Sequence, residues 1–299
     1  MDPAALMRCA SNVSCVVSQT SSGLVIGVLT FLVASGLTII FGVLKVVNFA
    51  HGAFYMLGAY VAYAVYVQTG SFLAAAVVAS LGIGIFAALI ERTIVRRIYG
   101  ADVLMQLLVF YALALILDDL VGLIWGVEFL SMGMPTAFRM PPIRIAGSPL
   151  PPYYLVAIGT SIVIGGAMFI MQSHTRFGKT IQAAALNSAM VSSLGVNTRL
   201  LFTIVFGLGG SLAGLAGALA APMRSLTPGL GLSILLESFV VTVIGGLGSI
   251  GGALVAAILI GLVRSWGSIG FPQFTNGLIF VVVLAVLLLR PNGLFRREA

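Results

Sequence analysis

Long apolar windows are the feature that most constrains how this chain can fold. Six runs have the roughly 20 mainly apolar residues that a helix needs to cross a bilayer, and they cover 22–44, 71–90, 103–125, 153–172, 200–221 and 273–290. Three less uniform runs, at 49–67, 230–247 and 249–266, bring the expected number of crossings to nine, or to eight if one of them is re-entrant. The windows predict an all-α, polytopic membrane helix bundle of 8–9 segments that forms a single domain over residues 1–299.

The charge content supports this class. The sequence is 60% hydrophobic and 8% charged, whereas soluble domains carry about 25% charged residues, so a soluble domain is excluded. The net charge of +7, from 15 basic and 8 acidic residues, could indicate a nucleic-acid partner if it formed a stripe facing water. The basic residues instead occupy short segments between apolar runs, which is a signal of membrane orientation.

Three basic segments predict which ends face the cytoplasm. They are ERTIVRRIYG after residue 90, the loop 173–199, and the terminal RPNGLFRREA. Nine crossings with the N-terminus outside and the C-terminus in the cytoplasm place all three inside, as positively charged short loops require. The segment 126–152, with six prolines and no helical period, then becomes an ordered or partly extended external loop.

The N-terminal residues give no sign of a cleaved leader. Residues 1–21 contain a single arginine and a polar run, SQTSS, and lack the features of a signal peptide, so we expect the first apolar segment to be retained. Cys9 and Cys15 match no metal motif and are too few for a disulfide framework. The sequence assigns them no role.

Two nucleotide-binding patterns occur in the wrong context. GLGSIG contains Gly246, Gly248 and Gly251 in dinucleotide-binding spacing, but that motif requires a strand before it and an acidic residue about 20 positions later. GKT at 178–180 lacks the earlier glycine of a phosphate-binding loop, because Ser173 stands there. With no metal cluster or catalytic triad in the sequence either, we expect no enzyme activity, no cofactor and no ATP hydrolysis by this chain.

The 36 glycines favour close helix packing. In lipid, small residues let helix backbones approach each other, and this contributes much of the association energy. The predicted packing positions are Gly58, Gly210, Gly214, Gly246, Gly248 and Gly251.

Polar residues inside apolar windows are the first candidates for a path through the membrane, because burying them in lipid is costly. Asn48, His51 and Tyr55 fall at i, i+3 and i+7, so one helix would place them on one face. We predict that they line a translocation path together with Glu237. The structural alternative is that Asn48 caps a helix start and that His51 bonds a neighbouring carbonyl group.

Other charged residues in the windows have more than one interpretation. Lys45 and Arg264 lie near predicted helix ends, where their side chains can extend to the interface. Asp118 and Asp119 lie toward the external end of their helix, either in water or against a cavity.

Three blocks of the sequence resemble one family. GLTIIFGVLKVVNFAHGAFYMLGAY (36–60), RFGKTIQAAALNSAMVSSLGVN (176–197) and VIGGLGSIGGALVAAILIGLV (243–263), with the RPNGLF ending, are similar to the inner-membrane permeases of branched-chain amino acid ABC transporters. The match is to the shorter of the two permease subunits. One departure is Ala53, where many relatives carry glutamate, so importers of urea, short amides or other organic solutes stay open as alternatives.

The resemblance implies partners that the residues alone do not. They are two cytoplasmic ATPase subunits, a second permease subunit that is identical or homologous, and an external solute-binding protein, with the chain in the bacterial inner membrane. It also implies that the loop 173–199 docks on the ATPase. A helix over about 179–194 would present small residues to a protein groove, although a helix lying in the lipid headgroups is the alternative. The implied docking residues are Gly178, Ala183, Ala184, Ala185, Leu186, Asn187 and Gly195.

These observations favour a permease that works by alternating access, with ATP hydrolysed on partner chains. An ion-coupled secondary transporter or channel is the second hypothesis, and it would use Asp118, Asp119 or Glu237 for coupling. A membrane-embedded enzyme is the least supported class, because no recognisable catalytic group occurs.

Overall fold

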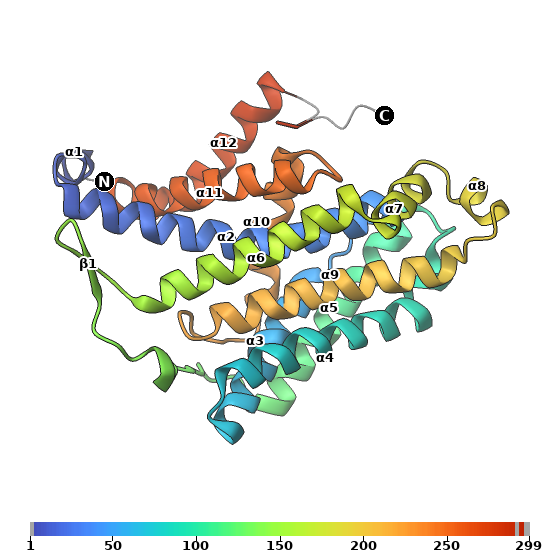
Figure 1. The fold of residues 1–299 in the computed structure, drawn as a ribbon, viewed down its shortest axis with the longest axis horizontal. Coiled ribbons are helices and arrows are strands. Elements are labelled where there is room, and N and C mark those ends of the chain that lie inside the picture. Colours follow the sequence, from blue (N-terminus) through green and yellow to red (C-terminus); the bar gives the residue numbers. More distant parts are fainter. Residues whose placement is uncertain (1–2, 291–292, 296–299) are drawn as a thin grey trace.

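The computed structural model describes residues 3–290 and 293–295, and most of them are helical (Figure 1). The long elements are α2 Val13–Leu44, α3 His51–Thr69, α4 Phe72–Thr93, α5 Val103–Trp125, α6 Pro152–His174, α9 Thr198–Ala220, α10 Leu230–Gly245, α11 Ile250–Gly270 and α12 Thr275–Leu289. The short ones are α1 Pro3–Ala10, η1 Val95–Ile98, η2 Thr136–Phe138, β1 Ile143–Ile145, β2 Ser148–Leu150, α7 Arg176–Leu186, α8 Ser188–Ser193 and η3 Pro272–Phe274.

The predicted polytopic helix bundle is confirmed, but the expected count of crossings is not. Among the described residues, six helices are long and apolar enough to span a membrane: α2, α4, α5, α6, α9 and α11. The window 273–290 gives only the 15-residue α12, and 230–247 gives the 16-residue α10. Both are shorter than the roughly 20 residues that a straight crossing needs. The 19-residue α3 is long enough, but a histidine and four tyrosines lower its hydropathy.

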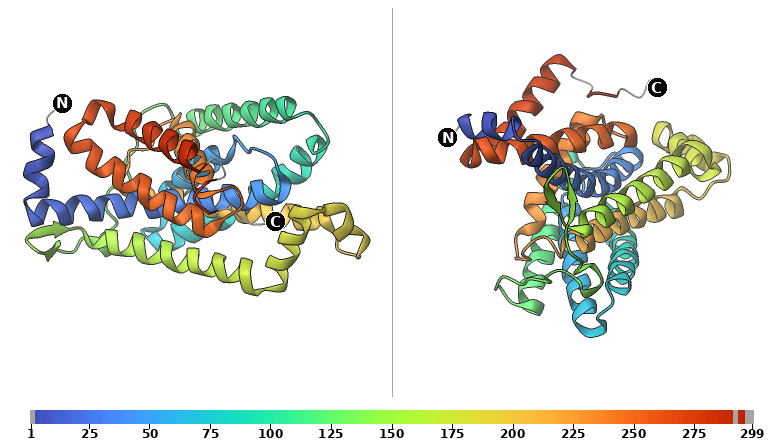
Figure 2. Two further views of the ribbon diagram at one scale, coloured as in Figure 1. Left: turned by 90° about the horizontal axis from the view of Figure 1, so that it is seen from above. Right: turned by 60° about the vertical axis from the view of Figure 1, so that its left-hand side comes forward.

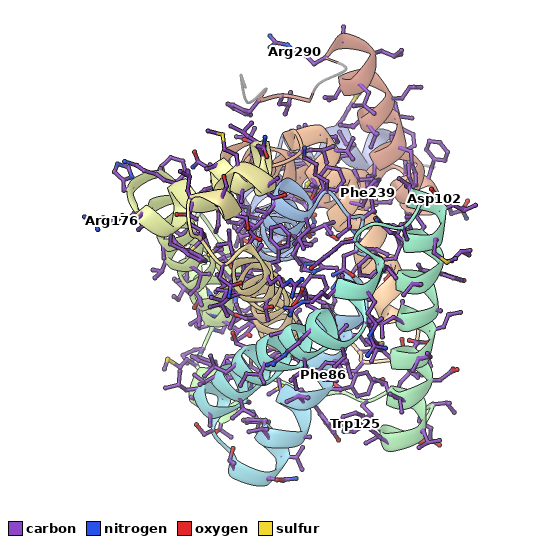
Figure 3. All side chains as sticks on the ribbon, turned by 90° about the vertical axis from the view of Figure 1, so that its right-hand side faces the viewer. Phe86, Asp102, Trp125, Arg176, Phe239 and Arg290 are labelled. Carbon is purple, nitrogen blue, oxygen red and sulfur yellow. A yellow bond between two sulfur atoms is a disulfide. The ribbon has the colours of Figure 1, made fainter. Side chains whose placement is uncertain are left out.

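The core forms around α9, which packs against α2, α3 and α4, while α11 runs beside α2 (Figure 1). α5 stands at the flank of the bundle between Asp102 and Trp125 (Figure 3) and contacts α3 and α10. Small residues permit these approaches. A Cβ atom at Gly58 would collide with the Gly214 backbone, and one at Gly210 with Ala87.

The other predicted packing glycines behave differently. Gly246 and Gly248 have positive φ angles of 96° and 90° in the turn between α10 and α11. This left-handed backbone is accessible to glycine at low cost, so their main role is to form the turn. A Cβ atom at Gly251 would meet nothing within 4 Å among the described residues, so close packing there does not require a glycine.

Two helices begin inside the bundle. His51, the first residue of α3, contacts α2 at Val33 and Gly36, well before α2 ends at Leu44. The six residues 45–50 therefore run back into the bundle without helical structure. Likewise α10 begins beside the start of α3, because Gly231 contacts Gly52. Irregular backbone at membrane depth is tolerated when protein surrounds it.

The two ends of the bundle carry different short elements. At one end lie α1 and the β1–β2 hairpin, in which Ile143 pairs with Leu150 and Ile145 with Ser148; we call this the hairpin end. α7 and α8 lie at the other, the docking-loop end (Figures 1 and 2). Much of the segment 126–152 is extended, and Leu130 forms a β-bridge with Leu226, so the segment is ordered by contact with the chain after α9.

The two cysteines form a disulfide, a role that the sequence did not assign. Cys9 in α1 is bonded to Cys15 in α2, six residues later. Between them Asn12 caps α2, since its side-chain oxygen accepts hydrogen bonds from the backbone N–H groups of Ser14 and Cys15. The disulfide and the cap together fix α1 at a sharp angle to the start of α2.

Candidate functional site

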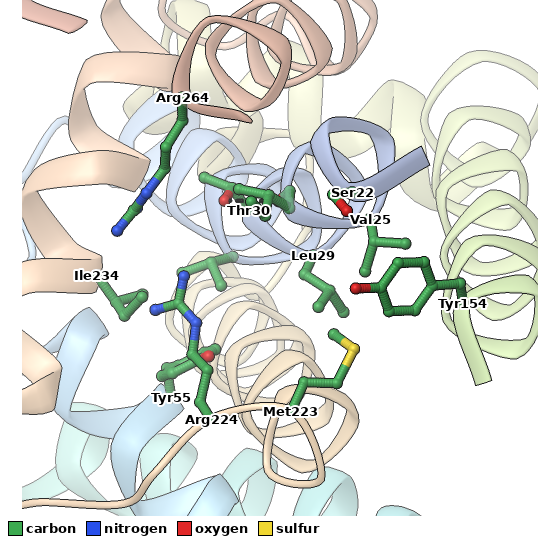
Figure 4. A pocket seen from close by; sticks show the side chains of 12 residues that line it. Ser22, Val25, Leu29, Thr30, Tyr55, Tyr154, Met223, Arg224, Ile234 and Arg264 are labelled. Atoms are coloured by element: carbon green, nitrogen blue, oxygen red, sulfur yellow. Dashed lines mark hydrogen bonds between the residues drawn. The ribbon is translucent and has the colours of Figure 1, made fainter. Parts of the chain in front are cut away.

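A cavity of about 340 Å³ lies in the half of the bundle nearer the hairpin end, and Figure 4 shows the residues that line it. It is bounded by α2, α3, α6, α10, α11 and the segment after α9. Its polar lining residues are Ser22, Thr30, Tyr55, Tyr154, Arg224 and Arg264. Its apolar lining residues are Val25, Ile26, Leu29, Val33, Met223 and Ile234. We call it the outer cavity.

A second cavity, of about 350 Å³, lies at the docking-loop end. It is bounded by the second half of α2, the end of α6, α7 and the turn after α10. The lining residues are Thr38, Ile39, Gly42, Val43, Lys45, Gln172, Ile181, Gln182, Ala185, Leu186, Leu247 and Gly248. We call it the inner cavity.

One turn of α2 separates the two cavities. Val33 lines the outer cavity and Thr38 the inner one, and residues 34–37 between them are all buried. Four helical residues rise by about 6 Å. Gly36 sits against the ring of His51 and the carbonyl oxygen of Gly209, so α3 and α9 close the bundle at this level. Two cavities on opposite sides of a thin packed layer are the geometry that alternating access requires.

The layer contains a buried hydroxyl cluster. The Thr38 hydroxyl lies 3.4 Å from that of Thr242 on α10, and the Thr242 hydroxyl donates to the Ser238 carbonyl oxygen at 2.8 Å. These bonds satisfy both hydroxyl groups without charge. The layer is therefore a weakly polar contact between helices rather than an ion-paired lock.

The predicted polar stripe does not form, because Asn48 precedes the helix that carries His51 and Tyr55. Tyr55 lines the outer cavity. Asn48 and His51 are fully buried and line neither cavity. The Asn48 side chain accepts a hydrogen bond from the Ala50 N–H group at 3.0 Å, and His51 Nε2 bonds the carbonyl oxygen of Val33 at 3.0 Å. The His51 contact matches its structural alternative. Asn48 instead bonds within the turn before α3, whose N-cap is Ala50 and whose first turn has no side-chain cap.

Three of the other charged candidates, Glu237, Arg264 and Asp118, have partners. Glu237 forms an ion pair with Arg264, so Arg264 turns into the outer cavity instead of extending to the interface. Asp118 accepts a hydrogen bond from the Gly229 N–H group at 2.6 Å, next to the first turn of α10. A carboxylate there stabilises the positive end of the helix dipole.

Arg224 is the site residue that sequence reasoning missed. It lies in the segment between α9 and α10 and lines the outer cavity with Tyr55 and Arg264. The available signal was an arginine in a loop that the expected topology places outside, against the usual preference of basic residues for the cytoplasmic side.

The docking loop is two helices, not the single helix expected over 179–194. Asn187 ends α7 and caps α8 by accepting a hydrogen bond from the Met190 N–H group. Ile181, Ala184 and Val191 are buried against the bundle. Leu186, Met190 and Leu194 are 72%, 62% and 74% exposed.

The implied docking residues divide in the same way. Gly178 is buried so close to the α6 backbone that a Cβ atom there would collide with it. Ala184 also faces inward. Ala183, Asn187 and Gly195 are exposed beside the apolar side chains of Leu186 and Leu194. Leu186, Met190 and Leu194 are therefore exposed apolar side chains on a surface that also carries Lys179 and Ser192, and no described part of the chain covers them.

A buried ion pair fixes the base of this loop. The carboxylate of Glu91, at the end of α4, is fully buried and lies 3.0 Å from Arg96 Nη2. The Thr203 hydroxyl on α9 donates to Glu91 at 2.6 Å, and the Tyr99 hydroxyl donates at 2.7 Å. Burial, and then the hydrogen bond to Glu91, raise the pKa of Tyr99 above its ordinary value of 10.0. The network joins α4 to the start of α9.

The comparisons with known proteins bear on this architecture. Residues 19–289 match the family described as "Branched-chain amino acid transport system / permease component". The chain belongs to this family. Two cavities in a multi-pass bundle are consistent with a permease component, and the family is one of transport permeases.

Curated relatives cover almost the whole permease. It is 26% identical to the high-affinity branched-chain amino acid transport system permease protein BraD of Pseudomonas aeruginosa, over 93% of this chain and 95% of the relative. It is also 26% identical to LivH of Escherichia coli, with the same coverage. A ribose import permease of Escherichia coli, RbsC, is 29% identical over 46% of each chain. No solved structure matches.

Proposed function

We propose that this chain is the membrane permease subunit of an ATP-driven importer for branched-chain or related small amino acids. Its relatives are described as branched-chain amino acid permeases, and the outer and inner cavities carry the proposal. A solute delivered at the hairpin end enters the outer cavity, rearrangement of the layer at residues 34–37 closes that side, and the inner cavity releases the solute.

The proposed partners are two cytoplasmic ATPase subunits, a second permease subunit and an external binding protein. The exposed face of α7 and α8, with Leu186, Met190 and Leu194, supports the ATPase contact. α7 also lines the inner cavity through Ile181 and Gln182. A push on this helix by the ATPase is thereby coupled to the width of the inner cavity.

We propose that the N-terminus lies outside and the C-terminus in the cytoplasm of a bacterial inner membrane. The Cys9–Cys15 disulfide supports this orientation, because disulfides persist in oxidising compartments and are rare in the cytosol. The basic loop 173–199 at the opposite end is consistent with it. The segment 126–152 then lies outside.

We propose eight to nine crossings, which adds α3, α10 and α12 to the six long helices. α3 and α10 begin beside each other inside the bundle, and each traverses the part of the membrane on its own side. This arrangement is the broken helix of many transporters, and it explains why α10 is only 16 residues long.

Reconstituted vesicles test the function. The chain is inserted with its second permease subunit, the ATPases and the external binding protein, and uptake of L-leucine is measured. We expect uptake to require ATP and all partners. Uptake by this chain alone under an ion gradient would overturn the proposal and would favour a secondary transporter.

A further inference from the structure

We propose that Arg224, assisted by Arg264, binds the carboxylate of the transported solute in the outer cavity. This inference rests on the proposed function and names the chemistry that the permease recognises: an anionic carboxylate attached to a small apolar group. Such a site would bind carboxylates in preference to urea and neutral amides, which the sequence left open as alternative solutes.

The charge of Arg224 has no partner within the part of the chain that the structure describes. The guanidinium group has no hydrogen bond or ion pair with a side chain or carbonyl group among residues 3–290 and 293–295. It lines the outer cavity and points into it (Figure 4). A guanidinium group presents several donors in a fixed fork that matches a carboxylate. A cation held at a cavity wall without an acceptor is well suited to an anionic ligand.

Arg264 adds to this charge without cancelling it. Its ion pair with Glu237 neutralises one of the two arginines, and Glu237 faces a different pocket, beside Ile279 and Phe280. The outer cavity therefore keeps a net positive charge from Arg224. The Arg264 guanidinium has five N–H donors, and its bonds to Glu237 leave others for a ligand.

The rest of the cavity suits an apolar group. In Figure 4 the guanidinium groups of Arg224 and Arg264 lie on the same side as Tyr55, while Val25, Leu29 and Met223 lie on the other. A cationic wall facing an aliphatic wall matches a molecule with a carboxylate at one end and a branched side chain at the other. The volume of about 340 Å³ is near the lower limit of about 300 Å³ for small-molecule sites.

Cysteine labelling measures the charge of the cavity directly. Ser22→Cys places a thiol in its wall, and Ser131→Cys places one in the exposed segment at the same end. The probes are the anionic sulfonatoethyl and the cationic trimethylammonioethyl methanethiosulfonates. We expect the anionic reagent to be favoured at position 22 relative to 131, and Arg224→Gln to lower that preference at least about fivefold, as removal of one nearby charge predicts.

Matched variants keep this result interpretable. Arg224→Lys retains the charge and should retain the preference, while Arg144→Gln removes an exposed arginine of β1 and should change nothing. If Arg224→Gln leaves the preference for the anionic reagent unaltered, in protein whose summed labelling rate with the two reagents is normal, the proposal is wrong. A variant that fails to fold is recognised by its gel-filtration profile, and Arg224→Lys then decides the outcome by comparison with Arg224→Met.

Protection by solutes distinguishes this proposal from the proposed function. L-leucine and 4-methylpentanoate should slow labelling of Ser22→Cys, and L-leucinamide should not. The assay needs neither ATP nor partners. Equal protection by leucine and leucinamide would overturn the carboxylate site even if vesicles import leucine. Selective protection without ATP-dependent uptake would instead overturn the importer and leave the carboxylate site standing.

Discussion

Gly52 of α3 and Gly231 of α10 meet backbone to backbone inside the bundle. A Cβ atom at Gly52 would collide with the carbonyl oxygen of Gly231, and one at Gly231 would lie 3.0 Å from the carbonyl carbon of Gly52. Each glycine is the second residue of its helix. This contact fixes the starts of α3 and α10 beside the layer that separates the two cavities.

Gly52→Ala should destabilise the permease strongly. Overpacking usually costs about 1–3 kcal/mol, and here the obstacle is backbone that cannot rotate away. We expect a marked fall in the yield of monodisperse protein and in its apparent melting temperature in detergent. Gly251→Ala is the matched control, because its Cβ atom meets nothing within 4 Å and alanine is the better helix former. Equal stability of the two variants would contradict the close approach.

Glu91→Gln should loosen the base of the docking loop. The amide cannot pair with Arg96 or accept as strongly from Thr203 and Tyr99, and leaving buried partners unsatisfied costs about 1–3 kcal/mol. We expect faster proteolysis within residues 173–199 of the purified protein. Glu128→Gln removes the same charge from an exposed position and should leave the rate unchanged. Identical cleavage of both variants would show that the network does not hold α9 in place.

Tyr99 predicts a loss of stability at high pH. Its pKa is raised in the folded protein by burial and by the bond to Glu91. Below its ordinary pKa of about 10, both the folded and the unfolded states keep the phenol proton. Above it the unfolded state loses the proton first, so the free energy of unfolding falls as pH rises. Melting curves between about pH 8 and about pH 11 should show a steeper decline for the natural protein than for Tyr99→Phe.

Hydropathy predicted the bundle because lipid imposes a simple rule on helix length and composition. The positions of polar side chains within the bundle were harder to predict. Periodicity placed Asn48, His51 and Tyr55 on one face, but it assumed one continuous helix, and α3 begins at His51. Where a helix begins inside a bundle depends on contacts with distant segments, here α2 and α10, which local pattern does not contain.

The remaining errors of the sequence-based prediction arose because interacting side chains lie far apart in the sequence. Arg264 looked like an interface residue until Glu237 was placed beside it, 27 residues earlier. Arg224 had no motif, because a cation that binds a ligand needs no particular neighbours in sequence. The break at Asn187, by contrast, was readable in principle, since asparagine is a good helix cap and a poor residue for a helix interior.

The disulfide gives a direct test of orientation. In intact cells, a maleimide-linked polymer should shift the mass of the permease only after treatment with a membrane-impermeant reductant, because Cys9 and Cys15 are bonded to each other and face outside in the proposed orientation. Closing so short a loop stabilises the structure by about 2 kcal/mol, so Cys9→Ser with Cys15→Ser should loosen α1 without preventing insertion. A mass shift before reduction would place the cysteines in a reducing compartment.

Leu186→Asp should uncouple the permease from its ATPases. Leu186 is 72% exposed where α7 borders the inner cavity, so a charge there stays in contact with water and disturbs a partner contact without being buried in the bundle. We expect normal insertion and melting temperature, with ATP hydrolysis in reconstituted vesicles no longer stimulated by solute and binding protein. Ala184→Asp is the comparison, because Ala184 is 3% exposed and an unpaired buried charge should destabilise the permease itself. Full coupling in Leu186→Asp would move the ATPase contact to another surface, and normal stability of Ala184→Asp would mean that α7 does not pack on the bundle through this face.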